Sequence, residues 1–129
     1  MIVVRSAEVV RLSHYCALRS SVRDVDPTQL LRGVLDLAVL AVLDRADGYG
    51  YEVLRGLRAA GLEEVGDASV YGTLRRLYNA GLLTSYVVPS EEGPHRKYYS
   101  LNAHGRDRLT ESTKAWRAFA GTMEGLVGG

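Results

Sequence analysis

Two short β-prone runs in the second half of the chain limit its possible folds more than any other feature. They cover residues 83–88 and 96–101, and the six residues 89–94 between them include two prolines and one glycine. Runs of this kind around a Gly/Pro-rich turn are typical of a β-hairpin. The other periodic segments have helical spacing. The expected order is therefore three helices, the hairpin and a last helix, without an internal repeat.

The first helix is expected to begin with Asp26 as N-cap and Pro27 as its first residue, and residues 30–43 form its apolar run. Leucine, valine and alanine occupy nearly its whole circumference. A helix of this kind must be buried on more than one side, and a partner subunit can supply one of them.

Two shorter helices should follow. One is expected over residues 51–60, with residues 48–50 as its entry, and ends at Gly61; the next is capped at Gly66-Asp67 and stops at Gly81. Two short helices joined by a brief turn, with a hairpin directly after the second, form a winged helix-turn-helix motif. The predicted fold class is mostly α, with a small β-hairpin wing and a C-terminal dimerisation helix.

In this motif the second short helix enters the major groove of DNA. Its buried stripe is predicted at Val70, Leu74 and Leu77, which follow each other at i, i+4 and i+7. The opposite arc consists of Ala68, Gly72, Arg75, Arg76 and Asn79, flanked by Ser69 and Tyr71. Small residues let the backbone approach the groove, and hydroxyl and guanidinium groups bind phosphates or guanine edges. The expected DNA-binding residues of this helix are Ser69, Tyr71, Gly72, Arg75 and Arg76.

The formal net charge of +1 is a sum over the whole chain, so it does not reveal a local basic region. Residues 68–90 contain two arginines and no acid, and the run His95, Arg96 and Lys97 is expected at the tip of the wing, where cations reach a groove or phosphate. The expected partner is double-stranded operator DNA. The alternative is a protein-interaction module that keeps the winged fold without DNA contacts, which predicts a wing without cations.

Asn102 can cap a last helix whose apolar positions alternate between spacings of three and four. These positions are Leu109, Ser112, Trp116, Phe119, Met123 and Leu126. The pattern is an a/d seam interrupted by Ser112, and such a stripe would be unfavourable in water. We therefore expect a homodimer whose interface consists of Leu109, Trp116, Phe119, Met123 and Leu126.

The length of 129 residues leaves room for one compact domain and a tail. We expect an N-terminal extension over residues 1–25, a DNA-binding domain over 26–101 and the dimerisation helix over 102–129. The extension is expected to be dispensable, with Val25 as a candidate alternative start. No apolar run approaches the roughly 20 residues of a membrane helix. A lone cysteine requires no oxidising compartment, so the cytoplasm is the expected location.

Signals for catalysis and metal binding are weak. The pair His14 and Cys16 offers too few ligands for a metal site, and His95 and His104 add no ligand spacing. The chain lacks a glycine-rich phosphate loop, paired catalytic carboxylates and a nucleophile elbow. We expect neither a cofactor nor a metal. An enzyme is the third hypothesis, because a ligand pocket can be mistaken for an active site.

Two motifs carry a family resemblance. Residues 68–77 read ASVYGTLRRL and residues 93–102 read GPHRKYYSLN. Together with GYGYE at 48–52, they resemble the PadR-type transcriptional repressors over about residues 28–127. The family often has Gly-Thr where this chain has Ala68-Ser69, and proline in place of Gly72.

The resemblance implies a dimeric winged-helix repressor that releases DNA on binding small phenolic or drug-like compounds. In short, multidrug-binding members the last helix crosses the partner subunit and a tryptophan on it lines a pore between the subunits. Trp116 lies at the matching spacing after Gly105, so Trp116 and Phe119 are the expected ligand-binding residues. Trp116 can equally be a seam residue that packs like Met123.

Overall fold

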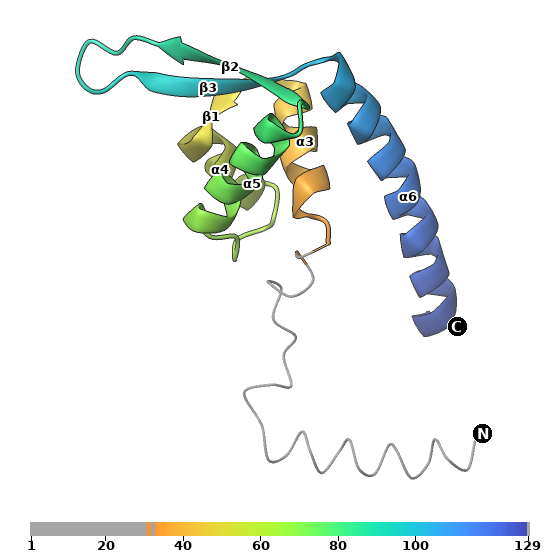
Figure 1. Ribbon diagram of the computed structural model, residues 1–129. Coiled ribbons are helices and arrows are strands. Elements are labelled where there is room, and N and C mark those ends of the chain that lie inside the picture. The colour runs from red at the N-terminus through yellow and green to blue at the C-terminus, as the bar shows by residue number, and fades with distance from the viewer. Residues whose placement is uncertain (1–30, 32, 129) are drawn as a thin grey trace, which may run out of the picture.

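The computed structural model describes residue 31 and residues 33–128, and the predicted extension, the Asp26 cap and the His14–Cys16 pair lie outside this part. Its elements, labelled as in Figure 1, are α3 (Leu35–Arg45), β1 (Gly48–Tyr49), α4 (Gly50–Ala59), α5 (Asp67–Asn79), β2 (Leu83–Val88), β3 (Arg96–Leu101) and α6 (Ala103–Val127). The predicted fold class, mostly helical with a small wing, is confirmed. Both predicted strands of the hairpin coincide with β2 and β3.

Two local predictions were wrong. The expected helical run over 30–43 is interrupted at Gly33 and Val34, which form a turn, so α3 begins only at Leu35. Glycine and β-branched valine both weaken a helix interior, and the apolar pattern continues across the break because core residues lie on both sides of it. The second error concerns residues 48–49, which we assigned to the entry of a helix. They form β1 and pair with Tyr98 and Tyr99 of β3.

A single apolar core lies between α3, α4, α5 and the sheet. It contains Val39, Leu40 and Leu43 of α3, Val53, Leu54 and Leu57 of α4, the predicted stripe Val70, Leu74 and Leu77 of α5, and Leu83 and Leu101 of the hairpin. Gly61 and Gly81 end α4 and α5 with φ angles of +118° and +82°, which favour glycine. The strand order is β1-β3-β2, all antiparallel.

The first turns of the long helix α6 anchor it to the core. The Oδ1 atom of Asn102 accepts a hydrogen bond from the Gly105 amide at 2.8 Å, and its Nδ2 donates to the Gly81 carbonyl at 2.9 Å. Gly105 is buried and Leu109 packs partly on the core. Beyond these turns, α6 extends away from the body of the domain (Figure 1).

Gly105→Ala is expected to lower the free energy of unfolding by about 1–3 kcal/mol, because an added Cβ would lie too close to the Leu82 carbonyl and 2.7 Å from the Leu101 side chain. Gly121 is the matched control, since a Cβ there meets open space in the same helix. Gly121→Ala should leave the stability unchanged or raise it by up to ~1 kcal/mol. Urea unfolding followed by circular dichroism measures both. Equal effects of the two substitutions would contradict the close packing of Gly105 against Leu82 and Leu101.

Candidate nucleic-acid interface

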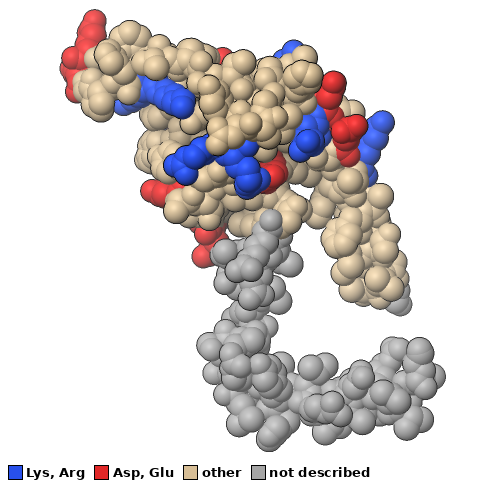
Figure 2. Space-filling model, viewed as in Figure 1, with Lys and Arg blue, Asp and Glu red and all other residues tan. Residues whose placement is uncertain are grey.

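The side of α5 that turns toward the wing forms a compact basic and aromatic surface. Tyr78 of α5 meets Tyr99 of β3 edge to face, with ring centroids 6.4 Å apart. The Nζ atom of Lys97 lies 5.1 Å from the Tyr78 centroid and 5.5 Å from that of Tyr99. Two aromatic rings therefore hold a wing cation beside the helix. Figure 2 shows lysine and arginine side chains over α5 and beneath the wing.

Tyr71 and Arg75 extend this surface toward the N-terminus of α5. Both are exposed, Tyr71 by 43%. Among the described residues, Arg75 has no carboxylate partner in an ion pair, so its guanidinium group is free to bind an anion. Tyr71 lies against Gly50 at the start of α4, where a Cβ would overlap the tyrosine ring. We name Tyr71, Arg75, Tyr78 and Lys97 the groove face.

Ser69 and Arg76 lie on the other flank of α5, next to α3. Arg76 Nη1 donates to Oδ2 of Asp36 at 2.7 Å, and Nη2 donates to Oγ1 of Thr73 at 3.4 Å. The hydrogen bond and charge of Asp36 raise the pKa of Arg76. Ser69, Gly72 and Arg76 line a shallow pocket of about 490 Å³ between the helices. The two neighbouring arginines therefore have different surroundings: Arg75 is open to solvent, whereas Arg76 is tied to α3.

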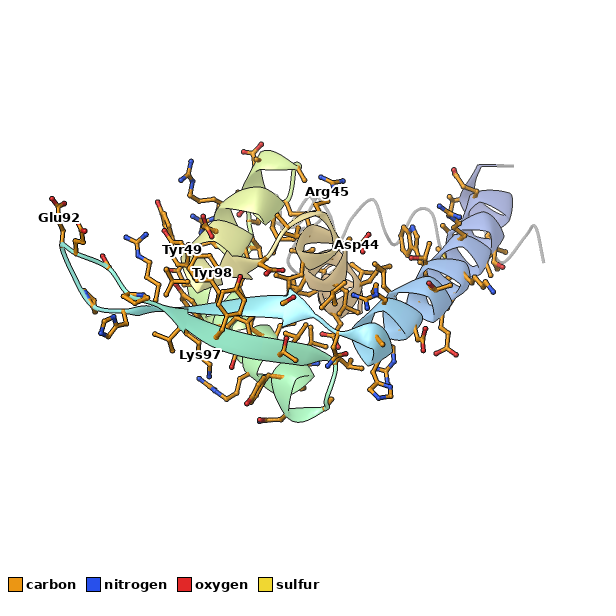
Figure 3. The ribbon with its side chains drawn as sticks, turned by 90° about the horizontal axis from the view of Figure 1, so that it is seen from above. Asp44, Arg45, Tyr49, Glu92, Lys97 and Tyr98 are labelled. Atoms are coloured by element: carbon orange, nitrogen blue, oxygen red, sulfur yellow. The ribbon has the colours of Figure 1, made fainter. Side chains whose placement is uncertain are left out.

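The wing also separates residues that are adjacent in sequence. His95 lies in the connecting loop, and Arg96 and Lys97 begin β3. Successive strand side chains point to opposite faces. The Arg96 guanidinium lies 4.7 Å from the Tyr49 ring centroid, far from the contact that Lys97 makes with α5. In Figure 3, Tyr49 and Tyr98 lie beside each other and Lys97 lies apart from them.

A row of three tyrosines crosses the outer face of the sheet, which the sequence did not predict. Tyr98 lies between Tyr49 and Tyr86, at centroid distances of 5.3 and 5.6 Å. The Tyr86 hydroxyl donates to Oδ2 of Asp47 at 2.6 Å, and this bond raises the pKa of Tyr86. Cross-strand aromatic pairs of this kind stiffen a sheet. The row therefore ties the two strands of the wing to β1 at the entry of α4.

Residues 39–111 match the model of the PadR-like transcriptional regulator family. The chain belongs to the PadR-like family. This confirms the resemblance seen in the α5 and wing motifs. Members of the family are transcriptional regulators and not enzymes, so the enzyme hypothesis is set aside.

Solved structures agree with this membership. A PadR-like transcriptional regulator from Bacillus cereus is 32% identical with a TM-score of 0.69, and the match covers 78% of this chain and 98% of that one. A Streptococcus transcriptional regulator is 34% identical with a TM-score of 0.67 and coverages of 76% and 96%. Bacillus subtilis PadR, solved in complex with operator DNA, is 21% identical with a TM-score of 0.58, covering 64% of this chain and 48% of that one. The last likeness concerns the fold alone.

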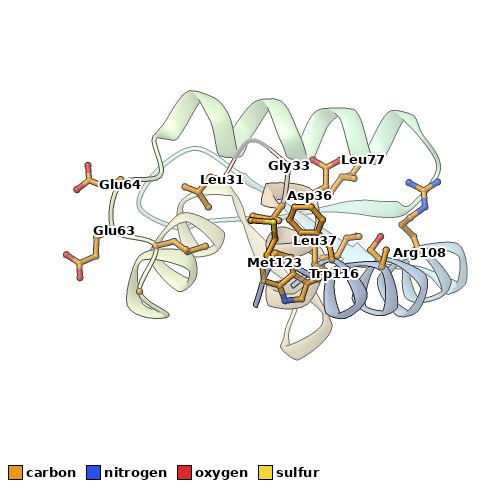
Figure 4. A pocket seen from close by; sticks show the side chains of 17 residues that line it. Leu31, Gly33, Asp36, Leu37, Glu63, Glu64, Leu77, Arg108, Trp116 and Met123 are labelled. Carbon is orange, nitrogen blue, oxygen red and sulfur yellow. The ribbon is translucent and has the colours of Figure 1, made fainter. Parts of the chain in front are cut away.

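The PadR-like regulator also contains a large apolar cleft on the side where α6 leaves the domain. It has a volume of about 1130 Å³ and lies between α3, the α4–α5 connection and α6 (Figure 4). The predicted ligand-binding residues Trp116 and Phe119 both line it, with ring centroids 6.4 Å apart, and Met123 lies beside them.

The structure divides the predicted dimer seam into three parts. Leu109 packs partly against the core. Trp116, Phe119 and Met123 line the cleft while remaining 43%, 60% and 39% exposed. Leu126 lies beyond the cleft and is 73% exposed. A partner helix would therefore meet only the second half of the seam.

Neither a metal-binding group nor a membrane-spanning helix is found in the described part of the chain. Across residues 31 and 33–128, no three His, Cys, Asp or Glu side chains are grouped so that they could hold a metal ion. Within the same residues, no helix combines the length and the apolar character that crossing a membrane requires.

Proposed function

We propose that this PadR-like regulator represses transcription by binding duplex operator DNA as a cytoplasmic homodimer, and that a small aromatic ligand releases it. The observation that carries the DNA-binding part is the groove face. There Arg75, two tyrosines and a wing lysine are held side by side on the exposed flank of α5. The operator complex of the B. subtilis protein, which shares the fold, supports the same kind of partner.

The proposed DNA-binding residues are Ser69, Tyr71, Gly72, Arg75, Arg76, His95, Arg96 and Lys97. Within this set, the groove face supplies the contacts nearest the groove, and Tyr78 joins it as a residue that the sequence reasoning missed. The sequence spacing could have identified Tyr78, because it follows Tyr71 by seven residues and so lies on the same flank of the helix. Arg96 and His95 belong to the outer part of the wing, where they would meet backbone phosphates.

The second candidate, a protein-interaction module, predicts a wing without cations. The position of Lys97 over Tyr78 argues against it, because it places a wing cation beside the proposed recognition helix. We retain the division into residues 26–101 for DNA binding and 102–129 for dimerisation. The exposed apolar side chains of the distal seam support a dimer, since a small monomer would leave them in water.

The ligand part of the proposal rests on the cleft. Indole and phenyl rings next to a volume of about 1130 Å³ suit a flat aromatic compound. An inducer must bind the DNA-incompetent arrangement of the two recognition helices more tightly than the competent one. Trp116 is the only tryptophan of the chain, so its fluorescence reports directly on the cleft. A compound that releases operator DNA equally from the parent and from Trp116→Ala would place the ligand elsewhere.

Salt titrations test the groove face. Arg75→Ala and Lys97→Ala should each reduce the slope of log affinity against log salt by about 0.9 for every phosphate that the variant no longer neutralises. The matched controls lie on α6: Arg117→Ala and Lys114→Ala remove the same side chains from exposed positions outside the proposed interface. Their slopes should equal that of the parent. An unchanged slope for both Arg75→Ala and Lys97→Ala would remove the groove face from the DNA contact.

A further inference from the structure

One arginine of the proposed recognition helix already has an anionic partner. Arg76 Nη1 donates to Oδ2 of Asp36 at 2.7 Å, and Nη2 donates to Oγ1 of the buried Thr73 at 3.4 Å. Asp36 is in the first turn of α3 and lines both the large cleft and the shallow pocket beside α5. The side chains of Arg76 and Asp36 are 59% and 47% exposed. A phosphate group can therefore reach the guanidinium group from solvent, and it meets the carboxylate there.

The two flanks of α5 therefore differ in charge. On the groove face, Arg75 has no carboxylate partner among the described residues. On the other flank, Ser69 and Arg76 line the shallow pocket together with Asp36, whose negative charge offsets that of the guanidinium group. A helix in the major groove has a phosphate backbone on either side of it. The flank of Ser69 and Arg76 would face one of these backbones with an arginine that is already paired.

We propose that Asp36 competes with a DNA phosphate for Arg76 and thereby weakens the binding of duplex DNA of any sequence. This inference rests on the proposed function and deepens its account of Arg76. On DNA, the guanidinium group exchanges the carboxylate for a phosphate, so the pair with Asp36 is lost and a negative charge is left beside the backbone. Both effects oppose binding. Phosphate contacts carry no sequence information, and they supply nearly all of the affinity for random sites. Asp36 therefore limits the binding of the regulator to random DNA.

The test measures the affinity of the full-length protein for a duplex of random sequence by fluorescence anisotropy, at about 0.1 M salt, where the Debye length is about 10 Å. Asp36→Asn should strengthen binding about two- to fivefold, the range of a solvent-exposed ion pair. Asp36→Glu keeps the charge and should restore the affinity of the parent.

Asp44→Asn is the matched control, because it removes the same charge from an exposed position of the same helix. Asp44 follows Asp36 by eight residues, about 12 Å along α3, so its charge is screened from the pocket and binding should change less than about twofold. Circular dichroism shows whether each variant is folded. An equal gain in Asp44→Asn and Asp36→Asn would replace the specific competition by a general effect of charge and overturn the proposal.

A double-mutant cycle isolates the competition for Arg76. Arg76→Gln alone should weaken binding, because the phosphate contact is lost. In the Arg76→Gln background, Asp36→Asn should give a smaller gain than in the parent, since only the repulsion between the carboxylate and the backbone remains to be removed. Equal gains in both backgrounds, or unchanged or weaker binding in Asp36→Asn, would overturn the proposal. If the parent binds no duplex at low salt, the proposed function itself fails; if the parent binds and Asp36→Asn gives no gain, only this inference fails.

Discussion

Replacing Phe119, Met123 and Leu126 together by glutamine is expected to give a monomer whose operator affinity is about 10²- to 10⁴-fold lower. Phe119 and Leu126 are 60% and 73% exposed in a single chain, so these substitutions remove apolar surface that the proposed partner subunit would cover. Two linked DNA-binding units engage the second half-site at a high effective concentration, and this advantage disappears in a monomer.

Sedimentation and operator titration measure the two effects. Lys114, Arg117 and Glu124 lie on the opposite side of α6, so their joint replacement by glutamine is the control and should preserve the dimer. Substitution is a sharper test than removal of residues 103–129, because Gly105 and Leu109 in the first turns pack on the core and their removal would also expose part of it. A triple variant that still sediments as a dimer would refute the role of α6.

Gly50→Ala is expected to lower operator affinity about 10- to 100-fold while the protein stays folded. A Cβ at this position would lie within 2.5 Å of the Cδ1 atom of Tyr71, so the ring would have to leave its observed position against α4 and Tyr71 would be misplaced within the groove face. The start of α4 thus positions a proposed DNA-binding side chain of α5. We expect the free energy of unfolding to fall by only about 1–3 kcal/mol.

A double-mutant cycle separates this effect from a general loss of stability. In a Tyr71→Ala background the added methyl group has room, so Gly50→Ala should cause little further loss of operator affinity. Gly121→Ala, at an open position of α6, serves as the control for a helical glycine. Equal losses from Gly50→Ala with and without the tyrosine ring would show that Gly50 does not act through Tyr71.

The secondary structure could be predicted because its signals are local. The strands β2 and β3 were located by β-prone runs next to turn formers, and both were predicted at their observed bounds. Gly61 and Gly81 ended the helices by positive φ angles, and Asn102 began α6 by capping it. By contrast, β1 has only two residues, which is too short for any periodic pattern, and it exists because it pairs with β3.

The residue types of the candidate site were also predicted, since basic and hydroxyl-bearing side chains on α5 and the wing are visible in the chain itself. Which of these side chains lie together on one face was not predicted. Arg75 and Arg76 are neighbours, but a rotation of about 100° per residue places them on different flanks. Only Arg76 meets Asp36, which lies 40 positions away in the sequence. Arg96 and Lys97 are separated in the same way by the alternation of a strand.

The sequence by itself determined which helices and which two hairpin strands form, where most of them end, and which kind of partner the exposed arc of α5 would suit. Only the tertiary structure decided that Lys97 lies over Tyr78, that Tyr71 rests on Gly50, and that Asp36 joins the cleft to α5. The reason is physical. Caps, turns and periodicity act between residues a few positions apart, whereas these contacts depend on how separate elements pack against one another across the core.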